Sequence, residues 1–200
     1  MLELNKSLPI YVVDDDESVR DSLELLLTEY DFNVASFDDG RHFLSQASIY
    51  EPGCVILDSR MPELLGQEVH QILTEKNSPL SVIFLTGHGD VPMAVSALRL
   101  GAVHFFQKPV RAATMLPAIR EALYQSEVNA RLLAGKEALD SLTNRELGIL
   151  RLLIAGKRNS SIADELCIAE RTVEVHRASL MKKFSARTVA ELAYVYGLVE

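Results

Sequence analysis

The sequence predicts an α/β chain with a doubly wound, five-stranded parallel sheet, followed by a small all-α helix-turn-helix domain. Short apolar runs alternate with longer amphipathic stretches up to about residue 117, a pattern typical of strands joined by helices. Strand signals then stop, and residues 141–200 contain only short helical patterns. The charge divides at a similar place, because residues 1–140 carry a net charge of −10 and residues 141–200 carry +2.

The first domain contains five runs rich in Val, Ile and Phe that are short enough to be buried strands. These runs are residues 9–14, 32–37, 53–58, 80–86 and 102–107. Helical patterns lie between them, near 17–30, 39–49, 64–76 and 91–100, with another after 111. Right-handed crossovers between the strands give a doubly wound sheet. Ligands of such sheets bind beyond the carboxyl ends of the strands, where we expect the functional side chains.

We expect the chain to divide into three segments. They are a first domain (1–122), a helical linker (123–140) and a helix-turn-helix domain (141–200). The linker can be one continuous helix or can bend at Gly135, its first strong helix breaker. The second domain has helical patterns at about 144–155, 160–166, 171–184 and 188–196.

Composition predicts a cytoplasmic globular protein. The chain is 48% hydrophobic and 24% charged, as in ordinary globular proteins. No apolar stretch reaches the roughly 18 residues that a membrane span needs, and the first residues lack the pattern of a secretory signal. Cys54 and Cys167 lie far apart without metal-ligand neighbours, so we expect free thiols in a reducing compartment.

Polar side chains follow four of the predicted strands. They are Asp14 and Asp15 after the first, Asp58 after the third, Thr86 after the fourth and Lys108 after the fifth. Each alone is common in a solvated turn, but their combination at neighbouring strand ends favours a functional site. Two carboxylates ~4 Å apart repel by roughly 4 kcal/mol at an effective dielectric of ~20, so the acids favour a hard cation such as Mg²⁺. An aspartate can also accept a phosphoryl group, whose charge a metal and a lysine neutralise.

Together, the segments DDD, LDSRMP, LTGHGD and QKPV resemble the receiver domain of two-component response regulators. The resemblance implies that a sensor histidine kinase phosphorylates Asp58. It implies a Mg²⁺ site made by Asp14, Asp15, Asp58 and the backbone carbonyl of Arg60. Ser59 departs from the family, which has an apolar residue at its position.

The same resemblance assigns roles to residues after the fourth and fifth strands. Thr86 bonds the phosphoryl group after transfer, and Lys108 contacts a phosphoryl oxygen. Phe105 occupies the position of the switch aromatic residue. The peptide bond before Pro109 is expected to be cis.

The second domain begins with a capping box, because Thr143 is followed three residues later by Glu146. Helices at 160–166 and 171–184, joined by a turn at Cys167–Ala169, form a helix-turn-helix pattern. We expect Val173, Leu180 and Phe184 to face inward on the second helix. A four-helix module that binds protein explains the same helical patterns.

LTNRE, GKRNSSIADEL and RTVEVHR resemble the output domain of the LuxR/NarL class, and TVEVHR resembles its FixJ subclass. The resemblance implies that the second helix binds promoter DNA. The candidate residues are Arg171, Thr172, Glu174, Val175, His176, Arg177, Lys182 and Lys183. Glu174 can accept a hydrogen bond from cytosine N4. Cys167 stands where many relatives have a glycine, and a positive φ at that position would cost energy and weaken the turn.

TGHGDVPMAV and GAVHFF in the first domain also resemble the FixJ subclass. The resemblance implies that phosphorylation causes homodimerisation or releases the output domain from inhibition, through the face formed by 91–100 and 102–107. The candidate contact residues are Val91, Val95, Leu98 and Arg99. RNA polymerase is a further partner expected of such a regulator. FLSQASIY, MPELLGQEVHQ and QKPV resemble one particular regulator of this class.

Two other function classes compete with a phosphorylation-switched transcription regulator. Aspartyl-phosphate phosphatases and phosphotransferases commonly place a nucleophile and an acid two residues apart in one loop. Here the residue two positions after Asp58 is Arg60, which favours a regulator that is not an enzyme. A signalling adaptor would use its second domain to bind protein instead of DNA.

Overall fold

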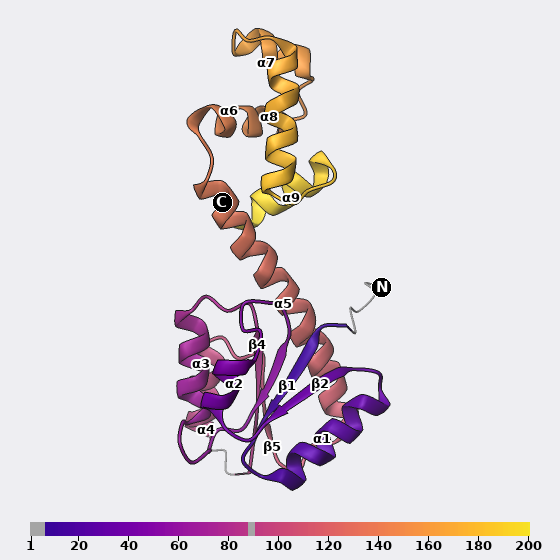
Figure 1. Cartoon of the computed structure of the whole chain (residues 1–200), viewed down its shortest axis with the longest axis vertical. Coiled ribbons are helices and arrows are strands. Elements are labelled where there is room, and N and C mark those ends of the chain that lie inside the picture. The colour runs from indigo at the N-terminus through magenta and orange to yellow at the C-terminus, as the bar shows by residue number, and fades with distance from the viewer. Residues whose placement is uncertain (1–6, 88–90) are drawn as a thin grey trace. The chain divides into compact units, whose positions relative to one another are not determined.

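The computed structural model describes residues 7–87 and 91–200 (Figure 1). The chain forms two compact units, Met1–Ala130 and Arg131–Glu200. Within the described ranges, no helix is both long enough and apolar enough to cross a membrane.

Among the described residues of the first unit, five parallel strands form one sheet in the order β2-β1-β3-β4-β5. The strands are β1 (Pro9–Val13), β2 (Asn33–Phe37), β3 (Cys54–Leu57), β4 (Ser81–Thr86) and β5 (His104–Gln107). The predicted doubly wound α/β fold is confirmed. Chain order reverses at β1, which pairs with both β2 and β3, so the crevice for a ligand lies beyond the ends of β1 and β3.

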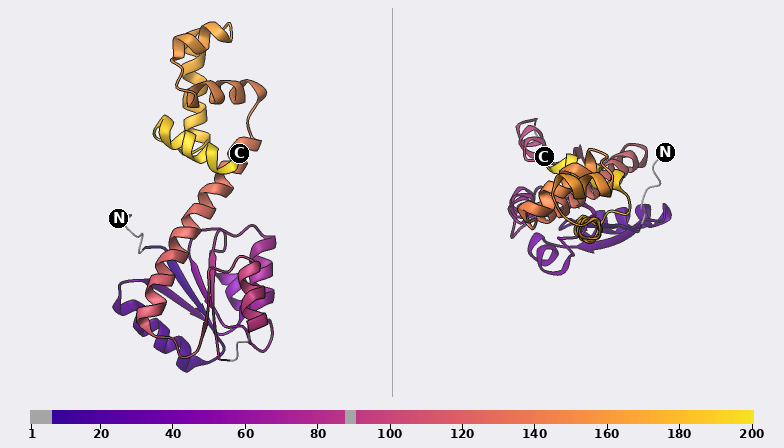
Figure 2. Two further views of the ribbon diagram at one scale, coloured as in Figure 1. Left: turned by 180° about the vertical axis from the view of Figure 1, so that it is seen from behind. Right: turned by 90° about the horizontal axis from the view of Figure 1, so that it is seen from above.

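Helices cover both faces of the sheet (Figures 1 and 2). They are α1 (Glu17–Glu29), α2 (Gly40–Gln46), α3 (Gly66–Glu75), α4 (Val91–Arg99) and α5 (Ala112–Asp140). Alternate strand residues point to opposite faces. Ile10 and Ile56 pack with side chains of α1 and α5, whereas Tyr11 and Val55 pack with those of α2 and α3. Every residue of β3 and β4 is buried, which explains their continuous apolar sequences.

The second unit is helical and has its own core. Its helices are α6 (Asn144–Ile154), α7 (Asn159–Glu165), α8 (Glu170–Lys183) and α9 (Val189–Val199), together with the C-terminal part of α5. The three residues predicted to face inward are buried: Val173 and Leu180 on α8, and Phe184 at its C-cap. They pack with apolar side chains of α6, α7 and α9, so these helices bury one shared core.

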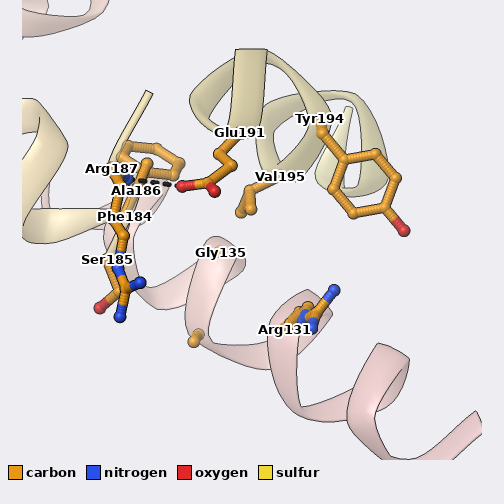
Figure 3. Close-up of a pocket in the computed structure, with 10 residues that line it drawn as sticks. Arg131, Gly135, Phe184, Ser185, Ala186, Arg187, Glu191, Tyr194 and Val195 are labelled. Atoms are coloured by element: carbon orange, nitrogen blue, oxygen red, sulfur yellow. Dashed lines mark hydrogen bonds between the residues drawn. The ribbon is translucent and has the colours of Figure 1, made fainter. Parts of the chain in front are cut away.

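Gly135 lies inside α5 and does not end it. A Cβ atom at this position would lie 2.8 Å from Cγ1 of Val195 and 3.0 Å from Cγ1 of Val199. The glycine therefore lets α5 and α9 approach closely. A hollow of about 370 Å³ opens beside this contact, and its lining includes Arg131 on α5 and Tyr194 on α9 (Figure 3).

Candidate functional site

Three carboxylates converge where β1 and β3 end. One side-chain oxygen of each of Asp14, Asp15 and Asp58 lies within 4.8 Å of the other two. The strands place them, because Val13 and Leu57 are register partners and the Asp58 amide donates to the Val13 carbonyl at 2.9 Å. Asp14 and Asp58 are only 2% and 6% exposed, whereas Asp15 is exposed. The cluster is thus a partly buried acidic crevice, open at Asp15.

Lys108 enters this crevice from the end of β5. Its Nζ lies 2.5 Å from Oδ2 of Asp14 and 3.6 Å from Oδ1 of Asp58. The Lys108 amide donates to the Thr86 carbonyl at 2.8 Å, which joins the ends of β4 and β5. The Lys108–Pro109 peptide bond is cis, as predicted. Four of the predicted strand-end residues therefore meet at one edge, and the fifth, Thr86, is buried at the end of β4.

The charge of the crevice suits an added cation. Three carboxylates face one ammonium, and burial raises the pKa of Asp58. The Lys108 ammonium opposes this rise in pKa, and the neighbouring Asp14 carboxylate adds to it. Because all the acidic donors are oxygen atoms, the set fits a hard divalent cation such as Mg²⁺. The Arg60 side chain is exposed, while its amide donates to Oδ2 of Asp58 at 3.3 Å.

Two nearby residues were not predicted from the sequence. Arg20 donates from Nη1 to the Asp14 carbonyl at 2.7 Å, which holds the backbone at the start of the acidic loop. Gly66 begins α3, and a Cβ atom there would lie 2.1 Å from the Asp58 carbonyl oxygen. The glycine in MPELLG was a visible signal, but the close approach of the two loops was not.

Asp16 has a different role from its two neighbours. It is the N-cap of α1, and its Oδ1 accepts hydrogen bonds from the Ser18 amide at 2.9 Å and the Ser18 hydroxyl at 2.6 Å. These bonds lower the pKa of Asp16. The third aspartate of DDD therefore starts the helix that follows β1.

A second acidic group, Asp38, Asp39 and His42, lies on the surface after β2. Oδ1 of Asp39 accepts from the amides of Arg41 and His42, so this carboxylate caps α2. Nδ1 of His42 lies 3.3 Å from Oδ1 of Asp38. These contacts give the group a local structural role.

The predicted switch residues are Thr86, at the end of β4, and Phe105 on β5, and the predicted dimer residues lie on α4. Phe105 is half-buried, and its ring centroid is 6.1 Å from that of Phe84 on β4. Val95 and Leu98 are 41% and 48% exposed, and Arg99 is also exposed. The structure describes the backbone of Val91 but not its side chain.

The predicted DNA-contacting residues all lie on α8. Five are exposed: Arg171, Thr172, Glu174, Val175 and Lys182. Val175 is 63% exposed, which is unusual for a large apolar side chain. His176, Arg177 and Lys183 are half-buried. Nη1 of Arg177 donates to Oδ1 of Asn159 at 3.3 Å, which links α8 to α7.

The turn between α7 and α8 contains the strain predicted for Cys167, whose φ is +51°. We expect Cys167→Gly to stabilise the second unit by roughly 0.5–1 kcal/mol, because glycine reaches this conformation without a steric cost. Urea unfolding of both proteins measures the difference. Cys167→Ala is the control, since it removes the thiol and keeps the strain. Equal stability of the glycine and alanine variants would contradict the prediction.

Glu146 forms the capping box predicted at the start of α6, and it is only 7% exposed. Its Oε2 accepts from the Thr143 amide and from Nζ of Lys183, each at 3.0 Å. The Thr143 amide bond, followed by the Lys183 bond, lowers the pKa of Glu146 from 4.5 to about 2.

Because the pKa of Glu146 is lower in the folded chain, its stabilising contribution is complete above pH 4.5 and is lost as the pH falls toward about 2. We expect Glu146→Gln to lower the melting temperature of the second unit at neutral pH. The difference from the wild type should shrink as the pH falls below about 4.5. Calorimetry across this range tests the prediction, and a difference independent of pH would contradict it.

Comparison with known proteins finds a match to one family in each part of the chain. Residues 10–120 match the family described as response regulator receiver domain, and residues 140–196 match bacterial regulatory proteins of the luxR family. The regulator that the three stretches named above resemble is the tetrathionate response regulatory protein TtrR. The chain is 44% identical over 186 residues to TtrR of Salmonella typhimurium, covering 92% of this chain and 89% of the relative.

Two further proteins extend the likeness over nearly the whole chain. It is 42% identical over 187 residues to the transcriptional regulatory protein FixJ of Bradyrhizobium diazoefficiens, covering 92% and 91% of the two chains. The solved structure of the response regulator StyR matches with a TM-score of 0.66 and 37% identity, covering 96% of this chain and 98% of that one.

These matches separate the hypotheses raised by the sequence. Both matched domains are parts of transcription regulators, so the enzyme hypothesis is rejected. The chain belongs to the response regulators of two-component systems, in the FixJ/NarL family that joins a receiver domain to a LuxR-type helix-turn-helix domain and regulates transcription.

Proposed function

We propose that Asp58 accepts a phosphoryl group from a sensor histidine kinase and that this event increases the binding of promoter DNA by α8. The observation that carries the proposal is the acidic crevice, in which Nζ of Lys108 lies 3.6 Å from the Asp58 carboxylate. In the transfer, an Asp58 oxygen forms a bond to phosphorus as the bond from phosphorus to the kinase histidine breaks. The Lys108 ammonium then donates to a phosphoryl oxygen.

Asp14, Asp15, Asp58 and the backbone carbonyl of Arg60 would hold Mg²⁺. When bound, this ion supplies positive charge that neutralises the phosphoryl oxygens. The chain itself keeps Asp14 and Asp58 facing each other through the β1–β3 pairing, and Arg20 holds the Asp14 carbonyl. The fit is supported by the excess of carboxylates over cationic side chains in the crevice.

We propose that phosphorylation of Asp58 draws Thr86 toward the phosphoryl oxygens. The Phe105 side chain then moves inward as well. Shifting a two-state equilibrium from 1:99 to 99:1 requires about 5.5 kcal/mol. Two or three charge-assisted hydrogen bonds of roughly 1.5–3 kcal/mol each are sufficient. Thr86 and Phe105 lie on neighbouring strands, and α4 precedes β5, so the change reaches the exposed Val95 and Leu98.

We propose that this face of α4 and β5 either joins two phosphorylated chains or, before phosphorylation, inhibits the second domain. A dimer would present two copies of α8 to half-sites about one turn of DNA apart. Arg171, Glu174 and Val175, which are exposed, are proposed to read base edges, and the exposed Lys182 is proposed to contact phosphate. The linker proposed at 123–140 contains the boundary between the compact units. The regulator is proposed to work in the cytoplasm and to contact RNA polymerase.

A gel-shift titration separates this function from that of an adaptor. The probe is a duplex enriched from a random pool by the full-length chain treated with acetyl phosphate and Mg²⁺. We expect a shift that grows on phosphorylation and weakens with added salt, because phosphate contacts release counterions. A chain that is phosphorylated once per molecule but shifts no duplex at low salt would favour the adaptor.

A further inference from the structure

We propose that Lys183 is a positioning residue for DNA recognition, which ties the end of α8 to the junction of α5 and α6, and that it does not contact DNA phosphate. This proposal rests on the proposed DNA-binding function of α8. The two adjacent cations then have different roles: Lys182 contacts DNA, and Lys183 supports α8 from within the domain.

The ammonium of Lys183 is already surrounded by acceptors. Its Nζ lies 3.0 Å from each carboxylate oxygen of Glu146 and 3.1 Å from the Ser141 carbonyl. An ammonium has three N–H donors and therefore needs three acceptors. Three oxygens lie within reach, so a DNA phosphate could bind only by displacing one of them.

The Glu146 carboxylate contacts two residues of α8, Ser179 and Lys183. Oε1 accepts from the Ser179 hydroxyl at 3.2 Å, and Ser179 lies one helical turn before Lys183. The same carboxylate accepts from the amide and the hydroxyl of Thr143, each at 3.0 Å, at the start of α6. Ser141 directly follows the end of α5. One nearly buried carboxylate and one ammonium thus connect the end of the linker helix, the start of α6 and the last turns of α8.

Lys182 offers a matched comparison on the same turn of the helix. Its side chain is exposed, whereas that of Lys183 is only 30% exposed. Successive helical residues point about 100° apart, so the two lysines face different surroundings. Replacing either lysine with methionine removes one positive charge and keeps a long side chain. A difference between the two variants therefore reports surroundings and not net charge.

The test measures the affinity of the phosphorylated full-length chain for the enriched duplex over a series of salt concentrations. Each phosphate contact contributes about −0.9 to the slope of log affinity against log salt. Lys182→Met should make the slope shallower by about 1. Lys183→Met should leave the slope unchanged and lower the affinity roughly 2- to 30-fold at every salt concentration, the range of coupling through packed networks.

Glu146→Gln is a second test of the role of Lys183, since it removes the charge of the partner and leaves every cation in place. It should lower the affinity with an unchanged slope. The double variant Glu146→Gln/Lys183→Met should lose no more affinity than the worse single variant, because it leaves no unpaired buried charge. Lys183→Arg should bind the duplex with higher affinity than Lys183→Met, since arginine keeps the positive charge and the N–H donors. Circular dichroism and thermal unfolding show which variants are folded; if Lys183→Met is unfolded, the affinity of the folded Glu146→Gln protein decides.

Two results would overturn the proposal. One is a slope that becomes shallower by about 1 in Lys183→Met, as in Lys182→Met. The other is a folded Glu146→Gln protein with wild-type affinity, which would show that the tie does not position α8. A wild-type chain that binds no duplex would instead reject the proposed DNA-binding function, and the role of Lys183 in recognition with it.

Discussion

Asp58→Asn is expected to leave the chain folded but unable to respond to a phosphodonor. Asparagine matches aspartate in size, but its amide cannot form an acyl phosphate. The variant should therefore lose the whole free energy by which phosphorylation shifts the conformational equilibrium. This is about 5.5 kcal/mol for a change in the ratio of active to inactive chains from 1:99 to 99:1. Intact-mass spectrometry measures the phosphoryl group, and anisotropy titration with the enriched duplex measures DNA affinity. Acetyl phosphate and Mg²⁺ should change neither value in the variant.

Asp16→Asn is the matched control for this prediction. It removes the same charge from the neighbouring loop, but Asp16 caps α1 through Ser18 and lies outside the group of converging carboxylates. Asparagine is also a good N-cap residue, so the helix should persist. This variant should still be phosphorylated and bind DNA in response. Phosphorylation of Asp58→Asn at the wild-type stoichiometry would mean that the acceptor is another residue.

Gly66→Ala is expected to destabilise the first unit by about 3 kcal/mol or more, a large effect for one methyl group. The added Cβ would lie 2.1 Å from the Asp58 carbonyl oxygen and 3.0 Å from Cα of Ser59. Both are backbone atoms at the end of a buried strand, so neither can move without shifting the phosphoacceptor. Urea unfolding measures stability, and the rate of phosphorylation by acetyl phosphate measures the displacement. Both should fall together.

Gly148→Ala is the control for a glycine with space around it. Gly148 lies inside α6, and apart from its chain neighbours and the backbone of that helix, no described atom would lie within 4 Å of a Cβ atom there. Alanine should stabilise this helix by about 1 kcal/mol, because it is the better helix former. A Gly66→Ala protein as stable as the wild type and phosphorylated at the same rate would show that the loop after β3 tolerates the methyl group.

The sheet and the convergence of the acidic crevice could be predicted from the sequence because both follow from local patterns. Fully buried strands such as β3 and β4 have continuous apolar sequences, and the carboxyl ends of parallel strands meet at one edge. Asp14, Asp58 and Lys108 could therefore be expected together before any distance was known.

Other features depend on contacts between segments that are far apart in the sequence, and local sequence patterns do not predict such contacts. The contact between Gly66 and Asp58, and the bond from Arg20 to the Asp14 carbonyl, depend on how two loops pack. Gly135 looked like a possible hinge, but its lack of a side chain serves the contact with Val195. The pairing of Lys183 with Glu146 could not be predicted either, because Glu146 lies in another helix.

The central claim is that phosphorylation of the crevice at Asp58 controls DNA binding by α8. The most direct test titrates the enriched duplex with the full-length chain, with and without acetyl phosphate and Mg²⁺, and measures the phosphoryl content of the same samples. The predicted result is one phosphoryl group per chain and an affinity higher by roughly 5- to 150-fold, the usual range of coupling between two sites. Full phosphorylation with unchanged affinity would contradict the claim.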